Sequence, residues 1–320
     1  MSLYDNALSF TISFAFMVLI VIILKHLKVL RKSDSELISR ITVDVVLPAL
    51  LISKLIHVKI ESSILIPCLV IVISELLLGI ASYSIGKYIL NLKRPSLAVF
   101  ILCSTFGSTA ILGTAFITAI FNGNDAIIAD ALLIAELSNG IPGYIFLYII
   151  AKNLGENNSS HESFIYILSD IILSPPVAAI ILSLTWSTLH LATSGVIITP
   201  IINSASYIGS SLVLMIALLN GLAIGPISIR HHIVTAIICI LLVLLIKPMI
   251  VYWLDGPFNL PIRDRQISVI ESAMPSANAV IAYAIRYNCD APLAAALVTS
   301  TAVIGAFTLP ALMKYLTIFI

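Results

Sequence analysis

The hydrophobic residues of this chain are concentrated in ten long runs, separated by stretches that are charged or rich in proline and glycine. A helix needs roughly 20 mostly apolar residues to cross the hydrocarbon core of a bilayer. The runs reach about this length, so the pattern predicts ten transmembrane helices. The predicted spans are Ala7–Leu24, Ile38–Ile56, Ile64–Tyr88, Leu97–Phe121, Ala126–Ala151, Phe164–His190, Pro200–Gly225, Ile233–Leu254, Gln266–Ile285 and Ala291–Ile318.

The composition supports an all-α integral membrane protein. Hydrophobic residues fill 60% of the 320 positions and charged residues only 10%, whereas an ordinary soluble domain carries roughly 25% charge. A soluble fold of this length has too little interior to hide so much apolar surface, which leaves lipid as the solvent. The net charge of +1 gives no indication of a nucleic acid partner.

No residue pattern indicates a cofactor, a metal site or an enzyme. The four cysteines form no CxxC pair and no metal-ligand spacing, so we interpret them as packing residues. The neighbours His231 and His232 cannot easily face one metal, and we interpret them as interface residues. Gly-x-Ser-x-Gly and His-Glu-x-x-His motifs are absent from the sequence, which disfavours a membrane-embedded enzyme.

Basic residues are distributed unevenly between the predicted loops. Met1–Asn6 contains neither a basic segment nor a cleavage site, so the first run is predicted to be a retained helix. With the N-terminus outside, the loops facing the cytoplasm carry eleven of the 17 basic residues. This bias predicts that both termini lie outside. The six basic residues assigned to the outside or elsewhere are Lys54, Lys59, Lys247, Arg263, Arg265 and Lys314.

A polar loop divides the chain into two halves with five predicted spans each. The halves are residues 1–151 and 164–320, and the linker at 152–163 is predicted to be cytoplasmic. Because five is odd, the halves have opposite orientations, which is a common plan for transporters. A shift of 165 positions aligns Asp125 with Asp290 and Ala126 with Ala291, in the fourth loop of each half. The sequence therefore predicts an inverted repeat.

The fourth and ninth spans carry residues that weaken a helix. Cys103–Thr114 is rich in serine, threonine and glycine, and Glu271–Asn278 contains Pro275. Proline removes a backbone donor and clashes with the carbonyl four residues back. Irregular backbone survives at membrane depth only where it is buried or lines a cavity. We therefore predict a binding site at two breaks; the alternative is close helix packing and a simple kink at Pro275.

Four acidic residues fall inside predicted spans, where each costs on the order of 2.5–3.5 kcal/mol at a helix centre. Glu75 and Glu136 lie near the middle of their spans, and Glu271 lies just before the break at Pro275. A carboxyl group in a dry cavity tends to be protonated, which suits proton coupling; the alternative is a neutral acid bonded to a neighbouring helix. For Asp44, four residues after Arg40, an ion pair on one helix face is the favoured interpretation.

Three motifs in chain order resemble the auxin efflux carrier family, which includes the plant PIN carriers and bacterial carriers for malonate-type acids. They are Leu47-Pro48-Ala49-Leu50, Phe106-Gly107-Ser108-Thr109-Ala110-Ile111-Leu112-Gly113 and Ala273-Met274-Pro275-Ser276-Ala277-Asn278. The resemblance implies a ten-helix inverted repeat of five plus five, in which helices four and nine are broken and cross at mid-membrane. It further implies transport of organic anions, with a substrate site formed by Gly107, Ser108, Thr109, Pro275, Ser276 and Asn278.

The sequence departs from the family pattern at two positions. Many members have asparagine where this chain has Ser108, and proline where it has Ala115. The shorter serine offers one hydroxyl in place of an amide, which leaves the identity of the solute open. The coupling mode of the family varies, so Glu136, Glu75, Asp44 and Glu271 remain candidates for binding a proton or a sodium ion.

The leading prediction is a secondary transporter for a small carboxylate in the cytoplasmic membrane, working by alternating access at the crossing. Its expected partners are the bilayer, the solute, a coupling H+ or Na+ and a second copy of the chain in a homodimer. The alternatives are a membrane channel and a solute sensor without coupled transport. Saturable flux distinguishes a carrier from a channel, and a sensor normally needs a signalling domain or partner.

Overall fold

The computed structural model describes residues 3–31, 33–57, 64–155, 169, 172–223 and 232–319. Within these ranges the chain is helical and contains no β-strand, which confirms the predicted all-α class. Six of the described helical segments are long and apolar enough to cross a membrane: Leu3–His26, Leu65–Ile89, Asp125–Leu154, Ile198–Leu222, Ile233–Phe258 and Ala291–Leu316. Several predicted features lie outside the described residues. They are the linker from 156 to 163, the start of the sixth span from 164 to 171 except Ser169, and Lys59, Arg230 and His231.

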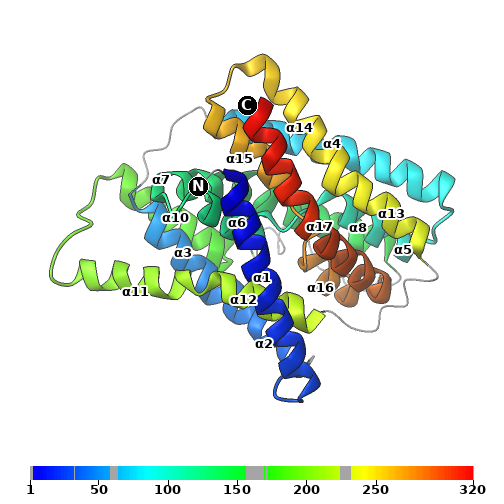
Figure 1. Ribbon diagram of the computed structural model, residues 1–320, viewed down its shortest axis with the longest axis horizontal. Helices are drawn as coiled ribbons and strands as arrows, with labels where there is room; N and C mark the ends of the chain where they lie inside the picture. The colour runs from blue at the N-terminus through cyan, green and yellow to red at the C-terminus, as the bar shows by residue number, and fades with distance from the viewer. Residues whose placement is uncertain are drawn as a thin grey trace.

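The first half of the chain forms long helices with short π-helical turns inside them (Figure 1). The π-helical turn η1 joins α2 to α3, and η5 joins α7 to α8. The bounds are α1 (Leu3–His26), α2 (Asp34–Ile41), η1 (Thr42–Val46), α3 (Leu47–Leu55), α4 (Leu65–Ser84), η3 (Ile85–Ile89), α5 (Arg94–Thr105), η4 (Thr109–Gly113), α6 (Thr114–Ile120), α7 (Asp125–Ala135), η5 (Glu136–Gly140) and α8 (Ile141–Leu154).

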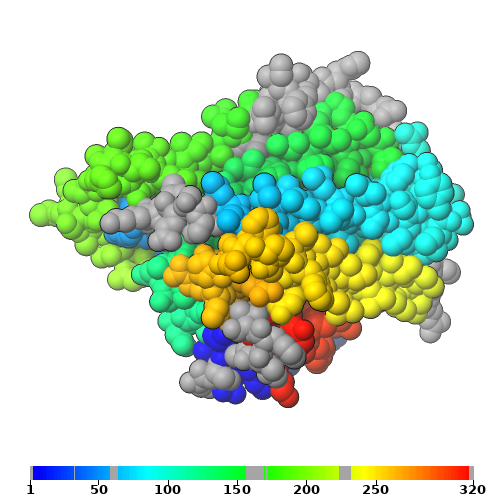
Figure 2. All heavy atoms as spheres, turned by 90° about the horizontal axis from the view of Figure 1, so that it is seen from above, coloured from blue at the N-terminus to red at the C-terminus, as the bar shows by residue number. Residues whose placement is uncertain are grey.

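The second half is built in the same way, with η7 inside one long helix and a gap between α15 and α16. Figure 2 shows the α13–α14 helix (yellow) lying beside α4 (light blue), and the two are in contact. The bounds are α10 (Pro175–Thr188), α11 (Ile198–Ser210), α12 (Leu212–Ala223), α13 (Ile233–Leu241), η7 (Leu242–Ile246), α14 (Lys247–Asp255), η8 (Gly256–Phe258), α15 (Ile262–Ser272), α16 (Ala279–Arg286) and α17 (Ala291–Phe319).

Three π-helical turns each end two residues before a proline. The turns η1, η5 and η7 precede Pro48, Pro142 and Pro248. Proline lacks an N–H and collides with the carbonyl four residues back in an α-helix. In each turn the residue before the proline bonds to the carbonyl five residues back, as Leu47 does to Thr42. We infer that the wider turn makes room for the proline ring, so these helices continue through it.

The described helices pack into two bundles. In the first bundle, α10 and α11 contact α3, and α12 contacts α1 and α2. The second bundle contains α4 to α8 and α13 to α17, where α5 contacts α4, α8, α13, α16 and α17. In Figure 1 the lower end of α1 and α2 point away from α5 and α13.

The two bundles pack against each other mainly at the end where both chain termini lie, which we call the termini end. One hydrophobic cluster joins Ala7 and Leu51 of the first bundle to Phe116, Ile128 and Met313 of the second. A separate cluster contains buried residues of the second bundle only. Among the described residues, the core that the bundles share therefore lies at the termini end.

Polar contacts also connect the bundles at the termini end. The Asn6 amide donates to the Ile120 carbonyl at 2.9 Å and to Asn122 Oδ1 at 3.3 Å. The Lys54 ammonium lies 2.5 Å from Asp125 Oδ1, which joins α3 to α7. Lys54 and Asn6 belong to the first bundle, whereas their partners belong to the second. These contacts close the termini end of the boundary between the bundles.

The link between π-helical turns and prolines predicts the effect of a proline at position 115. Ala115 stands two residues after η4, the same spacing as the three native prolines, and Thr114 already bonds to Thr109 five residues back. We expect Ala115→Pro to change the free energy of unfolding by less than about 1 kcal/mol. Thermal unfolding of the purified protein in detergent measures this change.

The matched control places proline in an ordinary α-helix. Ala131, in α7, is as well buried as Ala115 and has no π-helical turn before it. Ala131→Pro should cost about 3 kcal/mol or more, because the ring meets the carbonyl four residues back. Equal losses for the two variants would show that the π-helical turn gives no protection.

Candidate functional site

The chain is broken in two places that lie inside predicted spans. Helix α5 ends at Thr105, and Phe106 is extended with φ −100° and ψ 125° before η4 begins at Thr109. Helix α15 ends at Ser272, and α16 begins at Ala279. Each break lies between two helical pieces and leaves backbone amides and carbonyls without helical partners.

The two breaks lie against each other and pair through their main chains. Gly107 and Ser276 form an isolated antiparallel bridge. The Ser108 N–H donates to the Pro275 carbonyl at 2.7 Å, and the Ala277 N–H donates to the Phe106 carbonyl at 2.9 Å. Backbone polar groups that leave a helix inside a membrane need such partners, because lipid offers none. The two breaks therefore stabilise each other.

Glycines permit this close approach. A Cβ atom at Gly107 would lie 2.8 Å from the carbonyl oxygen of Met274, which is closer than real Cβ atoms come. Gly305 on α17 has the same relation to Pro275, since a Cβ there would lie 2.7 Å from the proline ring. A side chain at either position would push one break away from its neighbour.

Side chains from neighbouring segments satisfy further backbone groups at the breaks. The Ser276 hydroxyl donates to the Cys103 carbonyl at 2.6 Å, in the last turn of α5. The Ser276 N–H donates to Thr301 Oγ1 at 3.2 Å, and the Asn139 amide donates to the Gly107 carbonyl at 3.2 Å. The linear sequence gives no sign of these supporting roles, because they join residues that are far apart in the chain.

The structure brings all six predicted site residues to these breaks but separates them into two kinds. Ser108 and Asn278 are half-buried, and their side chains have no hydrogen-bond partner among the described residues. The others are buried in the contact between the breaks: Gly107, Thr109, Pro275 and Ser276. The Ser108 hydroxyl and the Asn278 amide are thus the polar side chains of this set that remain available to a solute.

A buried ion pair lies next to the first break. Lys247 Nζ is 2.9 Å from Glu75 Oε1 and donates to the carbonyl of Thr105, the last residue of α5, also at 2.9 Å. Lys247 is fully buried and Glu75 is 4% exposed. The count of basic residues placed Lys247 among the outside and remaining positions, and the structure shows that it is buried inside the protein. It lies inside the predicted span Ile233–Leu254, and this position already indicates a buried charge, which the count of basic residues did not consider.

The other acids differ in their surroundings. Glu136 and Glu271 are both buried, at 2% and 0% exposure, and Glu271 has no hydrogen-bond partner among the described residues. Asp44 is exposed, and the predicted Arg40–Asp44 pair is wrong. Arg40 instead pairs with Glu36 at 2.7 Å. An acid four residues before the base is the better orientation on a helix, which explains this choice.

The two arginines near the start of the ninth span are engaged with neighbouring groups. Arg263 lies 3.0 Å from Asp130, and Arg265 donates to the Tyr252 carbonyl at 3.0 Å. The Arg265 guanidinium also stacks 4.3 Å from the centre of the Tyr252 ring. Both guanidinium groups are therefore engaged with groups of the protein.

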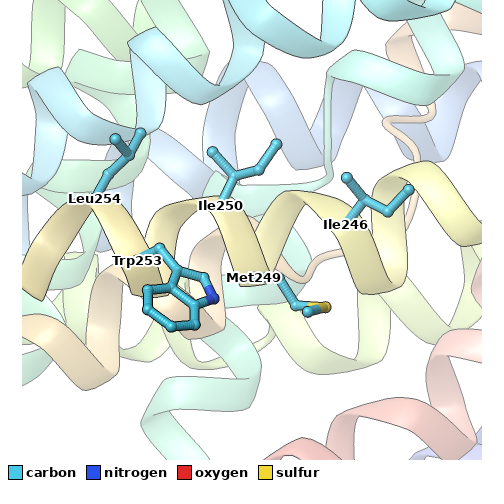
Figure 3. Close-up of a pocket in the computed structure, with 5 residues that line it drawn as sticks. All are labelled: Ile246, Met249, Ile250, Trp253 and Leu254. Carbon is cyan, nitrogen blue, oxygen red and sulfur yellow. The ribbon is translucent and has the colours of Figure 1, made fainter.

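A shallow hollow on α14 is chemically unlike the crossing of the two breaks. Figure 3 shows Ile246, Met249, Ile250, Trp253 and Leu254 on one side of this helix, and no polar atom lines the hollow. Trp253 is 73% exposed, as expected for a residue that faces lipid. An anion has nothing to bind there, so the crossing remains the candidate site.

Broken helices that meet inside the membrane are a feature of many transport proteins. A family model described as membrane transport protein matches residues 11–313, so the chain belongs to this family, the family of the auxin efflux carriers. This confirms the resemblance drawn from the sequence motifs. An uncharacterized transporter of Methanocaldococcus jannaschii is 26% identical over 292 residues, covering 87% of this chain and 91% of the relative. Both comparisons point to a membrane transporter rather than an enzyme.

The buried ion pair makes a prediction about stability. Lys247→Met leaves the Glu75 carboxylate buried without a partner, and we expect it to cost about 3–5 kcal/mol of unfolding free energy. The double variant Glu75→Gln/Lys247→Met removes both charges and should recover most of this loss. Thermal unfolding in detergent measures both. Equal losses in the single and double variants would indicate lost packing and not an uncompensated charge.

Proposed function

We propose that this protein is a secondary transporter that moves a small organic anion with a carboxylate group across the cytoplasmic membrane. The solute binds at the crossing of the two breaks, and the bundles rock around it to give alternating access. The observation that carries this proposal is the pairing of the breaks beside the half-buried and unpartnered side chains of Ser108 and Asn278. The proposal also includes a homodimer and both termini outside.

The local electrostatics favour an anion at this place. The helical segment that starts at Thr109 and helix α16, which starts at Ala279, both begin at the breaks. The first N–H groups of a helix lack internal acceptors and carry a partial positive charge. Lys247 adds a buried ammonium on the other side of the first break, where it is balanced by Glu75. A carboxylate between the breaks is therefore attracted by two helix starts.

Matching details in the two halves support a ten-span architecture built as an inverted repeat. Asn122 and Asn288 both have left-handed backbones, with φ of 53° and 51°. Asn124 then accepts from Ile127 N at the start of α7, and Asp290 accepts from Leu293 N at the start of α17. These pairs are related by a shift of 166 positions, one more than the shift that the sequence alignment used.

The packing of the bundles supports alternating access. Buried residues of both bundles share a hydrophobic core at the termini end, whereas a second cluster belongs to the second bundle alone. Removing the buried Lys247 from the count leaves eleven basic residues on the cytoplasmic side and five elsewhere, which supports a termini end that faces outside. With that orientation, the contacts that the rocking motion has to open lie on the outer side.

Transport measurements test the site. Proteoliposomes should take up labelled monocarboxylates or dicarboxylates saturably, which distinguishes a carrier from a channel. We expect Ser108→Leu and Asn278→Ala each to lower kcat/KM at least about tenfold, which corresponds to about 1.4 kcal/mol. The matched controls Ser204→Leu and Asn203→Ala change exposed residues of α11 and should leave uptake unchanged. Undiminished transport in both site variants would refute the proposed site.

The ion pair between the bundles tests the rocking motion. Lys54→Glu or Asp125→Lys opposes like charges at the termini end and should favour opening there, whereas the double exchange restores the pair. The labelling is measured in a protein that carries Ser108→Cys and lacks the four native cysteines. A thiol-reactive, membrane-impermeant reagent added from that side should label position 108 about two to five times faster in each single variant. Unchanged labelling would show that the pair does not hold this end closed.

A further inference from the structure

Glu271 is a buried acidic group without a hydrogen-bond partner in the described part of the chain. It lies in the last turn of α15, just before the second break, and is fully buried. Neither of its carboxyl oxygens has a hydrogen-bond partner among the described residues. A carboxylate normally accepts several hydrogen bonds, and burying one without partners is very costly. This position demands either a proton or another positive charge.

The Glu271 carboxyl group also touches the first break. A Cβ atom at Gly113 would lie 2.2 Å from Oε2 and 3.0 Å from Oε1, so the absent side chain of Gly113 leaves room for the acid. Gly113 belongs to η4, and its N–H donates to the Ser108 carbonyl at 3.1 Å. The acid thus reaches from one broken span to the other, one hydrogen bond away from a predicted solute contact.

The charged neighbours leave Glu271 unneutralised. Of the elements packed on α15, α14 contributes Lys247 and α4 contributes Glu75, but these two pair with each other. From α7, Asp130 pairs with Arg263 at the other end of α15, and η4 contains no titratable group. Lys247 and the acid Glu136 both act electrostatically on Glu271, but neither is hydrogen-bonded to it.

We infer that Glu271 is the proton-binding group of this transporter and that its proton travels with the organic anion. The inference rests on the proposed function and selects one of the four acids named from the sequence. Glu75 has a counter-charge in Lys247, and Asp44 is exposed. The Glu136 carboxyl group lies against Gly140 of its own helix, whereas the Glu271 carboxyl group lies against Gly113 of the other broken span.

The geometry links the proton to the solute. A solute carboxylate near Ser108 and an ionised Glu271 beside Gly113 would repel each other across a site with little water. Protonation of Glu271 removes this repulsion, so each ligand strengthens the binding of the other, as linkage requires. The loaded site then carries the anion and one proton with no added net charge. The expected stoichiometry is one proton for each monocarboxylate.

The first measurement does not depend on transport. Infrared spectra of the purified protein in detergent should contain the carbonyl band of protonated carboxyl groups, and one component of this band should shift in D2O and be missing in Glu271→Gln. The control Glu136→Gln should keep that component. If Glu271→Gln leaves the whole band unchanged, the inference fails even though the chain still transports. Gly113→Ala offers a second variant in case Glu271→Gln does not fold, because the added methyl group displaces the carboxyl group and should shift the band.

The second measurement is uptake of a labelled carboxylate into sodium-free proteoliposomes under an imposed pH gradient, with the lower pH on the side to which the carboxylate is added. Wild-type protein and Glu136→Gln should accumulate solute above its equilibrium concentration. In Glu271→Gln this accumulation should be at least tenfold smaller, whereas exchange of solute in the absence of a gradient should continue. Equal accumulation by Glu271→Gln, or a requirement for sodium, overturns the inference. Absence of any carboxylate uptake by the wild type, with the infrared band present, would instead refute the proposed function.

Discussion

The structure depends on one constraint, which is that backbone polar groups released from a helix inside a membrane must find partners within the protein. The two breaks meet this constraint through each other, by main-chain bonds from Ser108 to Pro275 and from Ala277 to Phe106. Gly107 is required for their close approach, and the supporting bond from Asn139 follows from the same need.

The buried charges follow a related rule. Lys247 is stable in the interior because it meets both a carboxylate and the carbonyl at the end of α5. It donates to the last carbonyl of α5, next to the first break. Glu271, in contrast, has no hydrogen-bond partner among the described residues, so Glu75 and Glu271 have different surroundings although the sequence places both inside apolar runs.

The sequence predicted the helical class and the transporter family because long apolar runs and three ordered motifs are local signals. It also located both breaks, since the proline, glycine and serine residues clustered there weaken a helix. It did not reveal the pairing of Lys247 with Glu75, and it favoured Asp44 as the partner of Arg40, which pairs with Glu36 instead. An ion pair between distant helices depends on three-dimensional packing that a single sequence does not contain, whereas the Arg40–Glu36 pair follows an orientation rule that the sequence already displays.

At the crossing, one set of groups holds the two breaks together and another set stays without a partner, which has a consequence for how such a protein acquires new substrates. Main-chain bonds hold the two breaks together, and Ser276 is already committed to the Cys103 carbonyl. The side chains of Ser108 and Asn278 take no part in that support. Under the proposed function, replacements at these two positions alter which acids are accepted while the architecture survives, so selectivity can diverge between relatives faster than the fold itself.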